Sequence, residues 1–184
     1  MRRVHLVRHG LPTLQPDLPP SRWHLDPAGL PAIDALRSSG RLPNDASWFS
    51  SPEPKAIDTA RRLTGCVVTA VDDLREHERG ATPWFDDPDE WSGVIRRVFD
   101  EPDRPALVGW EPLRRTSQRV VAAVRRILDE HPSDEIVLVG HGTAWAALTA
   151  SLLDAEPDLD AWEKLRMPDL WVLEVPDLPE PPGM

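Results

Sequence analysis

The chain has 184 residues, 40% of them hydrophobic, which fits one globular domain with its own buried core. Its 21 lysine and arginine residues against 31 aspartate and glutamate residues give a formal net charge of −10. Such an acidic chain repels nucleic acid and anionic membranes, so we expect no partner of either class. The single cysteine, Cys66, excludes an internal disulfide framework and cysteine-rich metal sites.

The two ends of the chain carry no targeting signal that we can identify. No apolar run approaches transmembrane length, and the charged residues Arg8 and His9 follow too early for the core of a signal peptide. We therefore expect a soluble, cytoplasmic protein. Proline recurs in the last nine residues, so we expect a single domain over 1–175 and a disordered tail over 176–184.

Strand-like and helix-like segments alternate along the chain. Short β-branched or apolar runs predict strands at 4–7, 46–50, 67–71, 136–140 and 170–175. Between them, helical spacing of apolar residues predicts helices at about 27–40, 52–65, 88–99, 112–131 and 144–153. This alternation predicts an α/β fold, a three-layer α/β/α sandwich whose mostly parallel sheet of five to six strands has helices on both faces. We expect residues 83–110, which are rich in proline and tryptophan, to be an inserted segment.

Two of these strands end in a histidine followed by a glycine. Arg8-His9-Gly10 follows the first strand, and His141-Gly142 follows the apolar run 136–140. Ligands of α/β sheets bind at the carboxyl ends of the strands. Arginine suits a phosphate or carboxylate, and histidine can be a base, a nucleophile or a metal ligand. Either histidine alone is most simply explained as a strand-end residue bonded to a backbone carbonyl, whereas the pair favours a functional site.

Two further segments can contribute to the same edge of the sheet. Lys55 lies at the start of the helix at 52–65, where backbone N–H groups and a lysine suit an anion. It is also compatible with an ordinary capped helix and a solvated lysine. Glu76 and Glu78 lie in the loop at 74–80, which follows the strand at 67–71, although mixed-charge loops are usually only solvated.

In this order, these motifs resemble those of the histidine phosphatase superfamily, also called the phosphoglycerate-mutase-like family. Arg8-His9-Gly10 and His141-Gly142 resemble its two histidine motifs, and residues 51–60 resemble its Ser-Pro-x-x-Arg-Ala-x-x-Thr-Ala segment, with Lys55 in place of arginine. Residues 74–80 resemble its Leu-x-Glu-x-x-x-Gly loop. Weaker matches are Leu25 to Gly29 with its Leu-Thr-x-x-Gly segment, and Gly109 with Arg119.

The resemblance implies a catalytic role for three residues. His9 attacks phosphorus as a neutral imidazole and forms a phosphohistidine. Glu76 protonates the leaving oxygen and later accepts a proton from water, so we expect its pKa to be raised. Glu78 is an alternative acid, but the family's spacing favours Glu76. His141, in its protonated form, helps to neutralise the phosphoryl oxygens.

The resemblance also implies which residues bind the phosphoryl group. Arg8 and Lys55 supply positive charge, Gly142 lies beside the second histidine, and Gln15 occupies the position of an amide that the family carries after its first histidine. Lysine keeps the charge of arginine but lacks its two-pronged donor, so the substitution at Lys55 can lower turnover. Neither a metal nor another cofactor is implied.

We therefore expect a phosphatase that hydrolyses a small phosphorylated substrate. A phosphoglycerate-mutase-type phosphotransferase is the first alternative, although the short chain and the acidic residues at 86–90 favour hydrolysis. A degenerate module that binds phosphate with little turnover is the second, suggested by Lys55 and by Leu11-Pro12 after the first histidine motif.

Overall fold

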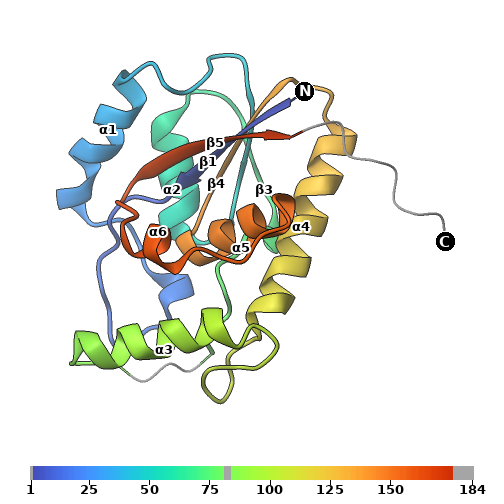
Figure 1. Cartoon of the computed structure of the whole chain (residues 1–184). Coiled ribbons are helices and arrows are strands. Elements are labelled where there is room, and N and C mark those ends of the chain that lie inside the picture. The colour runs from blue at the N-terminus through green and yellow to red at the C-terminus, as the bar shows by residue number, and fades with distance from the viewer. Residues whose placement is uncertain (1, 81–83, 176–184) are drawn as a thin grey trace.

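Five strands form one sheet at the centre of the computed structural model, which describes residues 2–80 and 84–175 (Figure 1). Their order across the sheet is β3-β2-β4-β1-β5. Neighbouring strands are parallel except β5, which is antiparallel to β1. The strands are β1 (Arg2–Arg8), β2 (Ser47–Ser50), β3 (Val68–Ala70), β4 (Glu135–Gly140) and β5 (Asp169–Val175). Every predicted strand is confirmed, while the tail predicted to be disordered lies outside the described residues.

Six α-helices accompany the sheet in the described part of the chain. They are α1 (Leu30–Ser38), α2 (Pro54–Leu63), α3 (Pro88–Asp100), α4 (Leu113–Glu130), α5 (Gly142–Leu152) and α6 (Leu159–Glu163). The first five correspond to the predicted helices, whereas the sequence analysis did not predict α6. Helix α2 begins at Pro54, two residues later than predicted, because the preceding Glu53 has an extended backbone conformation.

Helices cover both faces of the sheet, as predicted. Alternate residues of a strand point to opposite faces, so the core divides into two clusters. Helices α1 and α2 pack through Ile33, Leu36 and Leu63 against one face, and α4 and α5 cover the other with residues that include Val124 and Leu148 (Figure 1). The architecture is therefore α/β, with a mixed but mostly parallel sheet.

Helix α3 belongs to neither layer of helices on the sheet. In Figure 1 it runs across the bottom of the molecule. Its apolar side packs with Trp110, Leu113 and Ala147 in a separate hydrophobic cluster, to which α3 contributes Val94, Ile95, Val98 and Phe99. We refer to residues 84–110 as the cap segment.

Strand register brings the predicted site residues to one edge of the sheet. Arg8 is the register partner of Gly140, and Ser50 is the partner of Val139. The residues that follow β1, β2 and β4 therefore leave the sheet side by side. Among the described residues, no helix is both long and apolar enough to cross a membrane.

Candidate active site

His9 is held by the backbone on both sides. Its N–H donates to the carbonyl oxygen of Gly140 over 2.9 Å, and its Nδ1 lies 2.7 Å from the carbonyl oxygen of Gly10. A carbonyl can only accept, so Nδ1 carries the proton and Nε2 keeps its lone pair. Burial lowers the pKa of His9 well below its ordinary value, and the charges of His141 and Lys55 lower it further. His9 is thus a neutral imidazole with an available Nε2 at neutral pH.

His141 lies next to His9 at the start of α5. The centroids of the two imidazole rings are 5.2 Å apart. Nε2 of His141 lies 2.8 Å from the hydroxyl of Ser51 and 3.5 Å from Oε1 of Glu53. Burial lowers the pKa of His141 although the Glu53 carboxylate opposes this. The negative charge of a bound ligand favours the protonated form of His141 that the resemblance implies.

Arg8 reaches the same helix start from β1. Its Nη1 donates to the carbonyl oxygen of Leu165 over 2.8 Å. A Cβ at Gly142 would lie 3.3 Å from Nε of Arg8 and 3.3 Å from the indole nitrogen of Trp162. Glycine at this position thus allows the guanidinium to approach the N-terminus of α5, where helix geometry favours anions.

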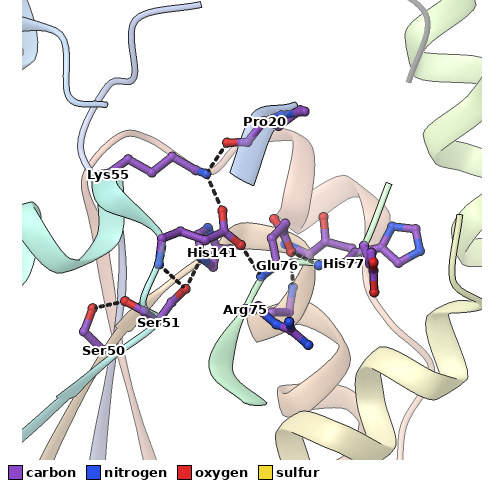
Figure 2. A network of polar contacts seen from close by, with 12 residues as sticks. Pro20, Ser50, Ser51, Lys55, Arg75, Glu76, His77 and His141 are labelled. Carbon is purple, nitrogen blue, oxygen red and sulfur yellow. Dashed lines mark hydrogen bonds and ion pairs between the residues drawn. The ribbon is translucent and has the colours of Figure 1, made fainter. Parts of the chain in front are cut away.

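Lys55 is buried and already has two partners. Its Nζ points toward the carbonyl oxygen of Pro20 (Figure 2), to which it donates over 2.7 Å. It also donates to Oε2 of Glu53 over 2.5 Å. Burial acts to raise the pKa of Glu53, but the charges of His141 and Lys55 outweigh it and lower the pKa. The ammonium group and the carboxylate thus form a buried ion pair. The sequence analysis did not identify Glu53, although it lies inside the motif that contains Lys55.

Glu76 is ionised in this structure, contrary to the raised pKa expected from the sequence. Burial acts to raise its pKa, but the charges of His141 and Arg79 and a bond from the N–H of His77 lower it to about 2. The carboxylate also accepts from the N–H groups of Thr143 and Ala144, over 3.2 and 2.9 Å. The neighbouring positive charges, together with bonds from three backbone donors, explain the discrepancy, because they stabilise the charged form.

The loop that carries Glu76 is fastened to α4. Arg119 donates to the backbone carbonyl oxygens of Asp73, Arg75 and Glu76 and to the carboxylate of Glu111. This agrees with the weak motif at Arg119, which acts here as a positioning residue. The side chain of the alternative acid, Glu78, is exposed, so the geometry favours Glu76.

Arg79 is a second guanidinium at the site that the sequence analysis missed. Its Nη2 donates to Oγ1 of Thr143 over 3.0 Å. Its guanidinium carbon lies 5.0 Å from the ring centroid of Trp91 and 5.6 Å from that of Trp110. The third tryptophan of the cap segment, Trp84, is exposed. The only signal for Arg79 was its place in the mixed-charge loop.

One predicted phosphate-binding residue makes its contacts through its main chain. Gln15 is exposed in the loop after β1, where its carbonyl oxygen accepts from Trp23 and Leu18. Among the described residues its side chain has no bond to the cluster. Within the same part of the chain, no group of three or more histidine, cysteine or acidic residues is arranged to hold a metal ion.

Comparison with known families identifies the class of protein. The model of the histidine phosphatase superfamily, branch 1, matches residues 4–175, and the chain belongs to this family. Figure 1 shows β1 and β4 side by side in the sheet. In the chain, His9 directly follows β1 and His141 directly follows β4.

The individual relatives are distant. The uncharacterized phosphatase PhoE of Bacillus subtilis (strain 168) is 23% identical over 176 residues, which cover 88% of this chain and 82% of the relative. The mycobacterial glucosyl-3-phosphoglycerate phosphatase, solved with inorganic phosphate, is 26% identical, with a TM-score of 0.67 over 90% of this chain and 84% of that one. A phosphoglycerate mutase from Bacillus anthracis str. Sterne is 17% identical, with a TM-score of 0.74 over 93% and 86% of the two chains, and shows the shared fold.

Proposed function

We propose that the protein is a phosphomonoesterase that works through a covalent phosphohistidine on His9. The observation that carries the proposal is the bond between Nδ1 of His9 and the Gly10 carbonyl oxygen, which leaves Nε2 with its lone pair. The lowered pKa of the same residue keeps it neutral, the state that a nucleophile requires. Phosphatases among its distant relatives also support hydrolysis.

The reaction consists of two displacements at phosphorus. Nε2 of His9 attacks the phosphorus atom, the bond to the leaving oxygen breaks, and that oxygen takes a proton from Glu76. Water then attacks the phosphohistidine, its proton passes to Glu76, and the N–P bond breaks to release inorganic phosphate. Arg8 and His141 lie beside the nucleophile, where positive charge stabilises the phosphoryl oxygens in both transition states.

Glu76 needs a different protonation state at the start of each step, and its low pKa in the unliganded protein suits only the second. As a carboxylate it is ready to accept a proton from water in the second step. In the first step it must be protonated, and a bound phosphate dianion raises its pKa by adding negative charge nearby. Substrates with poor leaving groups therefore depend on Glu76 more than activated aryl phosphates do.

The test is hydrolysis of 4-nitrophenyl phosphate by the wild type and by His9→Ala. We expect the variant to lose about 10³-fold or more in turnover, because the nucleophile is removed. His24→Ala, which changes an exposed histidine, is the matched control and should retain wild-type activity. Acid-labile phosphate on the wild type but not on His9→Ala would identify the covalent intermediate. Equal activity of wild type and His9→Ala would contradict the proposal.

The buried Lys55–Glu53 pair is the specific observation that favours the second candidate, a phosphate-binding module with little turnover. Wild type and His9→Ala that are equally inert on a panel of sugar phosphates, phosphoglycerate and nucleotides, yet bind inorganic phosphate, would support that candidate. Rapid exchange of 3-phosphoglycerate isomers with a bisphosphate primer would instead indicate a mutase.

A further inference from the structure

Lys55, the cation at the family's arginine position, is engaged before any ligand binds. A lysine ammonium has three N–H donors, and two of them go to the Pro20 carbonyl oxygen and the Glu53 carboxylate. The carboxylate also compensates the charge of the ammonium. Lys55 and Glu53 together therefore bring no net charge to an incoming phosphoryl group.

A count of the charged side chains at the site shows which residue supplies the positive charge that the Lys55–Glu53 pair does not. Arg8, Lys55 and Arg79 are cations, and Glu53 and Glu76 are carboxylates with lowered pKa values. Without Arg79, and with His141 neutral, this group of side chains holds two positive and two negative charges. With Arg79 the positive charges exceed the negative ones, as stabilisation of a phosphoryl dianion requires.

Arg79 also lies where a phosphoryl group beside His9 can reach it. Its Nη2 bonds to the side chain of Thr143, the second residue of α5, and the N–H of Thr143 bonds to Glu76. Burial is the largest cause of the lowered pKa of Arg8 and of His141, and the charge of Arg79 lowers both further. Arg79 is thus within electrostatic reach of both strand-end histidine motifs.

The guanidinium of Arg79 is held in position from the cap side. The rings of Trp91 and Trp110 lie within cation–π distance of it. The next residue, Gly80, has a φ of +45°, and a Cβ there would lie 2.6 Å from the carbonyl oxygen of Gly109. This close backbone approach requires glycine, and it joins the Arg79 loop to the cap segment.

We infer that Arg79 is a phosphate-binding residue of this site and contributes the two-pronged donor that Lys55 lacks. The inference rests on the proposed function, since both require a phosphoryl group beside His9. It assigns Arg79 to direct contact with phosphoryl oxygens, in addition to its contacts with the tryptophan rings.

The experiment measures binding of inorganic phosphate by titration calorimetry, which does not depend on turnover. Arg79→Met keeps an unbranched apolar stem against the tryptophan rings but removes the charge. We expect it to weaken phosphate binding about 10- to 100-fold, the range for a lost bond between charged groups. Arg79→Lys restores the charge without the fork and should lie between this variant and the wild type. It also provides the test if Arg79→Met does not fold.

Two controls separate the inference from a structural role. Arg75→Met removes a cation from the same loop, where Arg75 pairs with Asp72 at the surface, and should bind phosphate like the wild type. The double variant Lys55→Met/Glu53→Gln removes a cation and a carboxylate together and should lose less affinity than Arg79→Met.

Wild-type affinity in folded Arg79→Met, or a larger loss in the double variant, would overturn the inference. A wild type that binds phosphate but hydrolyses nothing would contradict the proposed function alone, with Arg79→Met still deciding the role of Arg79. A wild type that binds no phosphate would contradict both.

Discussion

The site combines two regions that are held in different ways. The strand-end residues Arg8, His9, Ser51 and His141 leave β1, β2 and β4 directly, and backbone bonds such as those from His9 to Gly140 and from Ser51 to Val139 fix them. The cap segment meets the site mainly through the rings of Trp91 and Trp110 against Arg79, beside the close backbone approach of Gly109 to Gly80. Backbone bonds of a buried sheet allow little adjustment, whereas stacked side chains can be exchanged without altering the sheet.

The difference indicates a division of labour. In the proposed reaction, the strand-end region positions the nucleophile and the phosphoryl group, which every phosphomonoester shares. We expect the cap segment to contact the leaving group, which differs between substrates. Changes in the first region should therefore affect all substrates alike, and changes in the second should alter selectivity.

The largest expected effect comes from Glu76, in the loop between the two regions. Glu76→Gln removes the proton donor and acceptor, so we expect turnover to fall about 10²- to 10⁴-fold. The loss should be larger for an alkyl phosphate than for 4-nitrophenyl phosphate, because the aryl leaving group needs no proton. Steady-state kinetics on both substrates measure the difference. Glu78→Gln is the control, and a larger loss there would reverse the assignment.

The Lys55–Glu53 pair should make the strand-end region sensitive to a single change. Glu53→Gln leaves a buried ammonium without its counter-charge, and breaking such pairs costs about 3–5 kcal/mol. Urea denaturation should show this loss of stability, and adding Lys55→Met should recover most of it. Asp34→Asn, which breaks an exposed pair with Arg62, is the control. Unchanged stability of Glu53→Gln would mean that the pair does not hold this region together.

A cap substitution should change selectivity rather than stability. Trp91→Ala removes a half-buried ring beside Arg79, and such ring contacts contribute about 1 kcal/mol. We expect the preference for an aryl over a small alkyl phosphate, as a ratio of kcat/KM values, to fall about fivefold. Trp84→Ala, an exposed change in the same segment, should leave the ratio unchanged. An equal loss on both substrates for Trp91→Ala would contradict the division between the regions.

The smallest expected effect is on the pH dependence of activity, which tests whether water is excluded from His9 in the strand-end region. Because burial lowers the pKa of His9, the nucleophile stays neutral as the pH falls through the ordinary histidine range. A nucleophile with a pKa of about 6.5 would retain only about one-eighth of its pH 7 reactivity at pH 5.5. At pH 5.5 we expect kcat/KM for 4-nitrophenyl phosphate, corrected for substrate ionisation, to remain above about half of its value at pH 7. An acid limb near pH 6.5 would show that His9 is hydrated.

Much of the fold and part of the site could be predicted from local patterns. The apolar runs that became β1 and β4 are visible in the sequence because strands buried in a parallel sheet need continuous hydrophobicity. His9 and His141 could be paired because each follows such a run. The short helix α6 was missed, since its five residues carry too little periodicity to distinguish it from a loop.

The sequence by itself determined the individual strands, the family motifs and the two histidines, because each depends on residues close together in the chain. Only the tertiary structure decided the charge state of Glu76, whose carboxylate meets backbone donors nearly 70 positions later. It likewise brought Arg79 to Thr143 and turned Lys55 toward Glu53. Electrostatic energies depend on distance and burial in space, and neither quantity can be read from the order of residues.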